Sequence, residues 1–234
     1  MEFVGVARGE AGVAKARRDG PDANGPKYRA RRDQILDIAV ASFRRRGYAG
    51  TSTQDISRAL HMTKGSLYYY FRDKEDILFG CHERALDHLL SIARAVRRAE
   101  PDPEAALREV IVKHVGIMVH AFRGTALALE VGHLTGARYQ RVVSRRDQYE
   151  GILRDILDEG VRSGAFRPMD TKLAAFAMLG AINWMARWYR DGGGMNPEDI
   201  GRGFADLFVG GLRPGRGGKR RVRAGSGRKK PRGE

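Results

Sequence analysis

The residues best suited to chemistry lie in one short stretch, and that chemistry is hydrogen bonding rather than covalent catalysis. Gly65 is costly inside a helix, by about 1 kcal/mol relative to alanine, and its missing side chain would let a partner approach the backbone closely. The first turn of a helix also exposes unpaired amide groups that suit a phosphate oxygen. Hydroxyl groups, one ammonium group and this glycine share the outward side of the predicted helix: Thr63, Lys64, Gly65, Ser66, Tyr68 and Tyr69.

Two short helices and the turn between them are needed to position that surface. Ser52, with Asp55 three residues later, is typical of a capped helix start, and Thr63 can cap the second helix. Asp73, followed by Asp76, repeats the pattern for a third, longer helix. A helix-turn-helix of this kind places the start of its second helix in the DNA major groove. Apolar residues at helical spacing give the short helices an inward side: Ile56, Ala59, Leu60, Leu67 and Phe71.

The run Leu67–Phe71 has a second interpretation, in which its side chains only fill the core. We expect this role for Leu67, Tyr70 and Phe71. Tyr68 and Tyr69 are predicted to face outward instead, where their hydroxyl groups can contact DNA.

The sequence of this region is similar to a known family. Thr63–Phe71, followed by Asp73–Leu78, resembles the DNA-binding segment of the tetracycline-repressor (TetR/AcrR) family, and the resemblance covers about residues 29–78. It implies an all-α protein, with a three-helix DNA-binding domain at residues 28–73 and a divergent helical ligand-binding and dimerisation domain at residues 74–212. It also implies DNA contacts by further residues: Tyr48, Thr51, Thr53, Gln54 and Lys74.

The charge of the chain is unevenly distributed. The net charge is +15, but the segment from Arg213 onward holds ten basic residues and one acidic residue, a net +9. We expect residues 1–27 to be a disordered basic arm and residues 213–234 a disordered basic tail. An alternative function follows, in which the protein binds nucleic acid non-specifically through these tails.

The rest of the chain is predicted to be helical, with no convincing strand. Apolar residues recur three to four apart in Lys74–Ala99, and Pro101 and Pro103 end this long helix. The total is nine: three helices in the DNA-binding domain, namely residues 29–46 and the two short helices, and about six in the C-terminal domain, of which the helix that starts at Lys74 is the first. The further helices are expected at residues 29–46, 104–120, 125–135, 137–163, 171–190 and 197–212.

The last two helices are apolar on more than one side, which predicts a role beyond the core. In the family they usually form a four-helix interface with their symmetry mates. A two-fold dimer would place two recognition helices about one DNA turn apart, on a palindromic operator.

The segment Ala181–Arg190 resembles family members that sense acyl-coenzyme A thioesters. Arg187 and Arg190 could then bind phosphates, and Trp184 or Trp188 could stack on the adenine. In the alternative interpretation, the tryptophans are dimer core and the arginines a solvated rim. An apolar channel for the acyl chain would be lined by five residues: Met118, Phe122, Leu127, Tyr149 and Phe176.

The sequence lacks the motifs that would indicate other classes of function. The sequence has no Gly-x-Ser-x-Gly nucleophile turn, phosphate-binding loop or dinucleotide fingerprint, and no two histidines lie three or four apart. We therefore expect no enzyme, no cofactor and no metal site, but a ligand-responsive repressor whose partners are operator DNA, a second copy and a small effector. The single cysteine and the lack of a long apolar run predict a cytoplasmic protein with no membrane association.

Overall fold

The architecture is helical throughout the part of the chain that the structure describes. The computed structural model describes residues 25–120, 131–190 and 192–215, which form eight α-helices and no β-strand. This confirms the expected all-α fold with an N-terminal helix-turn-helix. The helices are α1 (Pro26–Arg46), α2 (Thr53–Ala59), α3 (Lys64–Tyr70), α4 (Lys74–Ala99), α5 (Pro103–His120), α6 (Gly136–Ser163), α7 (Thr171–Trp188) and α8 (Pro197–Leu212).

Three helix predictions need correction. The helix expected at residues 125–135 lies mostly outside the described residues, and Val131–His133 form only a 3₁₀ turn. Helix α1 begins at Pro26 rather than residue 29, because proline suits the first turn of a helix. Helix α7 ends at Trp188 rather than residue 190, because Tyr189 has an extended backbone conformation.

The expected helix caps are confirmed. Ser52 and Asp55 form a reciprocal capping box, with the Asp55 amide 3.1 Å from Ser52 Oγ and the Ser52 amide 2.9 Å from an Asp55 carboxylate oxygen. The Ser66 amide donates to Thr63 Oγ1 over 3.0 Å at the start of α3. The Asp76 amide donates to the Asp73 carboxylate at the start of α4. These caps fix where α2, α3 and α4 begin.

A small apolar core holds the first three helices against the start of α4. Helix α1 buries Ile35, Leu36, Ala39, Val40 and Phe43. Of the residues predicted to face inward in the two short helices, Ile56, Leu67 and Phe71 are buried and Leu60 is partly buried, whereas the inward position expected for Ala59 is wrong because this residue is exposed. The turn between α2 and α3 contains His61, whose positive φ of 52° sharpens the chain reversal. The buried residues of this core are Ile35, Leu36, Ala39, Val40, Phe43, Ile56, Leu67, Phe71, Ile77 and Leu78.

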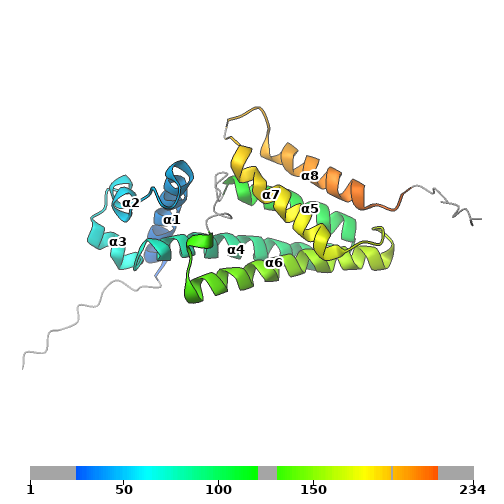
Figure 1. Ribbon diagram of the computed structural model, residues 1–234, viewed down its shortest axis with the longest axis horizontal. Helices are drawn as coiled ribbons and strands as arrows, with labels where there is room; N and C mark the ends of the chain where they lie inside the picture. The colour runs from blue at the N-terminus through cyan, green and yellow to red at the C-terminus, as the bar shows by residue number, and fades with distance from the viewer. Residues whose placement is uncertain (1–24, 121–130, 191, 216–234) are drawn as a thin grey trace, which may run out of the picture.

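Helix α4 joins the two helical units. Its 26 residues span about 39 Å at 1.5 Å per residue. Figure 1 shows α1–α3 gathered around one end of α4, while α6 runs beside α4 and α5, α7 and α8 lie toward its other end. Helix α4 therefore contributes to the cores of both units.

In the larger unit, the last helix, α8, lies against α5. Arg213, just after α8, donates its Nε–H to the Glu104 carboxylate over 2.9 Å. None of the helices described here is both long and apolar enough to span a membrane.

Candidate nucleic-acid interface and effector cavity

Helix α3 presents the predicted hydrogen-bonding face to solvent. All six candidate residues are exposed, whereas Leu67 between them is fully buried. Tyr68 and Tyr69 are 42% and 46% exposed, which is unusual for aromatic side chains. The hydroxyl groups of Thr63 and Ser66 lie 2.8 Å apart at the start of the helix. The surface is thus a short row of donors and acceptors on a rigid support.

The two exposed tyrosines are held by neighbouring groups. The ring of Tyr69 makes edge contacts with Tyr70, at 5.0 Å between centroids, and with Tyr28 of α1, at 5.8 Å. Tyr70 is half-buried and stacks on Tyr28, so its predicted inward position is correct. The ammonium group of Lys64 lies 5.7 Å from the centre of the Tyr68 ring. These contacts restrict the side chains that would face DNA.

Gly65 is not required by packing within the protein. A Cβ atom built at this position would meet only Thr63 Oγ1, at 3.8 Å, which is ordinary van der Waals contact. Because alanine is the better helix former, the protein's own stability does not explain this glycine.

Predicted DNA contacts from α2, α3 and α4 meet at one open groove beside α3. Thr53, Tyr68 and Lys74 all line it, and the Thr53 and Tyr68 hydroxyls are 3.5 Å apart. Lys74 donates to the backbone carbonyl oxygen of Tyr48 over 3.0 Å, and its ammonium lies 4.2 Å from the centre of the Tyr48 ring. Gln54 is exposed on α2. The groove combines hydroxyl groups and the Lys74 ammonium group with two carboxylates, Asp55 and Asp73, which pair with Arg46 and Arg138.

Thr51 does not fit the predicted interface. It is 1% exposed, and its hydroxyl lies 2.9 Å from the Gly47 carbonyl oxygen and 3.2 Å from that of Ser42. The hydroxyl therefore holds the turn between α1 and α2. The Thr51 side chain is thus engaged within the protein, although the residue borders the same groove as Thr53, Tyr68 and Lys74.

A cluster of charges ties α6 to the start of α4, and sequence reasoning missed it. The Arg138 guanidinium lies 3.0 Å from Asp73, 3.3 Å from Glu75 and 3.6 Å from Asp76. Thr135 adds two hydrogen bonds to Glu75, from its amide over 2.7 Å and from its hydroxyl over 3.1 Å. We call Thr135, Arg138 and these three carboxylates the α4–α6 clasp.

The clasp adjoins the candidate DNA-contacting residues. His133, in the turn before α6, stacks on the Tyr48 ring with 4.7 Å between centroids. Burial, followed by the charges of Glu75 and Asp73, raises the pKa of Tyr48. The turn before α6 thus contacts Tyr48, the residue that also holds Lys74.

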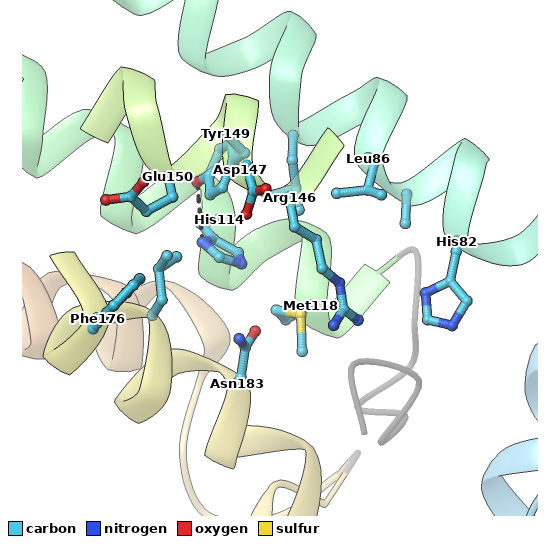
Figure 2. Close-up of a pocket in the computed structure, with 13 residues that line it drawn as sticks. His82, Leu86, His114, Met118, Arg146, Asp147, Tyr149, Glu150, Phe176 and Asn183 are labelled. Carbon is cyan, nitrogen blue, oxygen red and sulfur yellow. Dashed lines mark hydrogen bonds between the residues drawn. The ribbon is translucent and has the colours of Figure 1, made fainter. Parts of the chain in front are cut away.

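A cavity of about 190 Å³ lies between helices α4, α5, α6 and α7 (Figure 2). Three residues predicted to bind a ligand line it: Met118, Tyr149 and Phe176. Phe122 and Leu127 lie outside the described residues. The other lining residues are His82, Ala85, Leu86, Leu89, His114, Arg146, Asp147, Glu150, Leu179 and Asn183.

The buried polar groups of the cavity fall into two sets. In one, the Tyr149 hydroxyl lies 3.0 Å from His114 Nδ1, so these groups satisfy each other. Burial lowers the pKa of His114 to about 4 and raises that of Tyr149, which keeps both groups neutral at pH 7. In the other set, His82 is buried, and its Nε2 has no hydrogen-bond partner among the described residues.

Arg146 also lines the cavity, and its charge acts on His82. Burial, and then the positive charge of Arg146, lower the pKa of His82 to about 3. Burial also lowers the pKa of Arg146 itself. The sequence did not predict either residue. His82 follows Cys81, and Arg146 lies in the charged run Arg145–Asp147, and neither local pattern indicates whether the side chain lines a cavity or is exposed to solvent.

Of the segment predicted to bind coenzyme A, only Asn183 lines this cavity among the described residues. Trp184 is 61% exposed, Arg187 is exposed, and Trp188 packs partly against the core. Arg190 donates to the carbonyl oxygens of Arg187 and Tyr189. The contacts predicted for these four residues, with the phosphates and adenine of coenzyme A, would therefore have to be made outside the cavity and stay a prediction.

Helices α7 and α8 expose large apolar side chains on their outer side. Leu173 and Trp184 of α7 are more than half exposed, as is Leu207 of α8. Phe204 and Phe208, on α8, contact each other and are only partly buried. We call these five residues of α7 and α8 the outer apolar face.

Comparisons with known proteins agree with this arrangement. Residues 35–81 match the bacterial regulatory proteins of the tetR family, and residues 100–212 match the tetracyclin repressor-like C-terminal domain. The crystal structure of the TetR-family regulator PfmR from Thermus thermophilus is 34% identical, with a TM-score of 0.72 over 77% of this chain and 100% of PfmR.

Two further relatives are repressors or operator-binding proteins by their names. The repressor KstR2 of Rhodococcus jostii (strain RHA1) is 29% identical over 78% of this chain and 91% of KstR2. A crystal structure of AibR in complex with isovaleryl coenzyme A and operator DNA is 28% identical, with a TM-score of 0.66 over 76% of this chain and 97% of AibR. The chain thus belongs to the TetR family of transcriptional regulators, and it is a DNA-binding regulator rather than an enzyme.

Proposed function

We propose that this protein is a ligand-responsive transcriptional repressor, which leaves its operator when a small, mostly apolar effector enters the cavity. The observation that carries the proposal is the double role of α4. Its first turn carries Lys74 and the carboxylates of the α4–α6 clasp, and its middle lines the cavity with His82, Leu86 and Leu89. A ligand that moves α4 relative to α6 would therefore change the position of α3.

The proposed repressor acts as a homodimer on a palindromic site. The outer apolar face of α7 and α8 supports this, because a second copy related by a two-fold axis would cover it. Two copies of α3 would then reach successive major grooves, about 34 Å apart. Because the operator is genomic DNA, we place the protein in the cytoplasm.

An acyl-coenzyme A thioester is the effector class that we test first. AibR was crystallised with isovaleryl coenzyme A, and the cavity here is lined mainly by apolar side chains. At 10–15 Å³ for each water-sized site, 190 Å³ holds on the order of a dozen non-hydrogen atoms. The acyl group would occupy the cavity, and the coenzyme would have to lie outside it.

Two measurements test the proposal. Selection from random DNA should yield one palindromic sequence, and a chain lacking residues 1–24 and 216–234 should keep that preference. Loss of all binding in the shortened chain would favour non-specific binding through the tails. A thermal-shift panel of acyl-CoAs, free coenzyme A, free acids and unrelated apolar compounds should then identify a ligand that also lowers operator affinity. If no ligand does so, the protein is not ligand-responsive as proposed.

A further inference from the structure

Three tyrosine rings from two helices meet beside the exposed face of α3. Tyr28, in the first turn of α1, stacks on Tyr70 with 4.9 Å between ring centroids and 28° between ring planes. The Tyr69 ring is nearly perpendicular to both, at 79° and 5.8 Å from Tyr28 and at 88° and 5.0 Å from Tyr70. Each pair thus has the stacked or edge-to-face geometry that aromatic rings prefer. We call these three residues the tyrosine cluster.

The members of the tyrosine cluster differ in exposure. Tyr70 is half-buried and packs against the apolar core. Tyr28, also half-buried, lies against Tyr70. Tyr69 is 46% exposed and belongs to the predicted hydrogen-bonding face of α3. The cluster therefore connects a ring of the interior with a ring at the surface proposed to face DNA, and Tyr28 is the member that comes from another helix.

The start of α1 has few local features that would keep Tyr28 in place. Gly25 provides no side-chain hydrogen bond at the N-cap, and the first turn has no acidic residue. A helix end of this kind frays easily unless tertiary contacts order it. The stacking of Tyr28 on Tyr70 is such a contact. It orders the start of α1 and the ring that touches Tyr69 at the same time.

A side chain discriminates best between base pairs when it is held in one direction, because contact with a base edge depends on geometry. An ordered side chain also loses less conformational entropy when DNA binds. We infer that Tyr28 is a positioning residue for operator recognition: its ring fixes the direction of Tyr69, and thereby sets the discrimination at the base pair that Tyr69 faces. This inference rests on the proposed function, since it assumes that the exposed face of α3 contacts operator DNA.

The test measures discrimination between sequences as well as affinity. The full-length protein is titrated with the sequence selected from random DNA and with every single base-pair variant of one half-site. Tyr69→Ala identifies the base pair that Tyr69 faces, as the position where discrimination is lost. Tyr28→Ala should reduce discrimination at the same position by about two- to tenfold, the range for one aromatic pair, and leave the other positions unchanged.

Three further variants separate positioning from a general loss of stability. Tyr28→Phe should restore discrimination, since it keeps the ring contacts, which need no hydroxyl group. Val40→Ala removes buried apolar atoms from the same helix, so it should lower the free energy of unfolding and leave discrimination unchanged. Tyr28→Ala combined with Tyr69→Ala should discriminate no worse than Tyr69→Ala alone, because Tyr28 acts through Tyr69. Tyr28→Leu, which keeps an apolar side chain but no flat ring, replaces Tyr28→Ala if that variant does not fold.

Several outcomes overturn the inference. Discrimination that is unchanged in Tyr28→Ala does so, as does a loss that is equal at all positions, or a Tyr28→Phe protein that discriminates as poorly as Tyr28→Ala. Unchanged discrimination in Tyr69→Ala also overturns it, because Tyr28 would then have no contact to position. In each of these cases the proposed repressor stands, since that function fails on other results, namely that no sequence is selected or that no ligand lowers operator affinity.

Discussion

Gly65 is the residue whose replacement separates folding from DNA recognition most clearly. The space around it accepts a methyl group, and alanine is favoured over glycine in a helix. Gly65→Ala should therefore raise the free energy of unfolding by up to about 1 kcal/mol. It should at the same time weaken operator binding by about tenfold or more, because the added methyl group would keep the α3 backbone away from DNA. Denaturant unfolding and operator titration measure the two effects.

A second glycine provides the control for this substitution. Gly151 lies in the middle of α6, and a Cβ there would meet nothing within 4 Å. Gly151→Ala should stabilise the protein similarly while leaving operator affinity unchanged. If Gly65→Ala binds the operator as tightly as the unaltered protein, α3 does not approach DNA through this surface.

The two buried histidines predict how stability depends on pH. The pKa values of His82 and His114, about 3 and about 4, lie below the ordinary value near 6.5, so below pH 6.5 the unfolded chain binds more protons. Stability is thus complete above pH 6.5 and falls as the pH decreases toward 4. Each histidine contributes about 1.4 kcal/mol per pH unit, so the loss between pH 7 and 5 should be about 4 kcal/mol.

Denaturant unfolding at several pH values measures this slope. His82→Leu should reduce it by about half, while His88→Gln, at an exposed position, should leave it unchanged. An unaltered slope in His82→Leu would mean that His82 is not the buried neutral group described above.

At the scale of helices, the coupling that we propose between the cavity and the DNA-binding face runs through the α4–α6 clasp. Exposed ion pairs add little to stability, so Arg138→Ala should lower the free energy of unfolding by less than about 1 kcal/mol. It should weaken the response to effector much more, because movement of α6 would no longer reach Asp73 and Glu75. We expect the effector-induced change in operator affinity to fall by about fivefold or more.

The test measures operator affinity with and without effector in each variant. Arg141→Ala is the matched control, since Arg141 lies about one turn further along α6 and pairs with Glu83 rather than with the first turn of α4. The role given to the clasp would be wrong if both variants responded to effector equally.

The same helices show what the sequence could and could not reveal. Capping residues act within three or four positions, so Ser52, Thr63 and Asp73 marked the starts of their helices correctly. The direction of the Thr51 hydroxyl and the partners of Arg138 depend on segments far apart in the chain. In a helix as rich in charge as α6, a buried arginine and a solvated one have the same local pattern, so Arg146 gave no signal.

At the scale of the whole molecule, the outer apolar face predicts how copies assemble. Leu207 is 68% exposed on α8, and a central apolar residue replaced by a charge would oppose association. Leu207→Glu should weaken dimerisation by about 2–4 kcal/mol and lower operator affinity with it. Analytical ultracentrifugation gives the dissociation constant.

Met195 provides the matching control. It is similarly exposed but lies in the loop between α7 and α8. Met195→Glu should leave the dimer intact. A Leu207→Glu protein that remains dimeric would show that copies associate through another surface.

Helix α4 is one continuous helix shared by both helical units, and the coupling that we propose through it must be reciprocal by thermodynamic linkage. If effector lowers operator affinity by some factor, operator DNA must lower effector affinity by the same factor. Protein free in solution would then bind effector more tightly than protein bound to DNA. The effector concentration at which transcription begins would rise with the number of operators that the cell carries, so copy number would tune the threshold without any change in the protein.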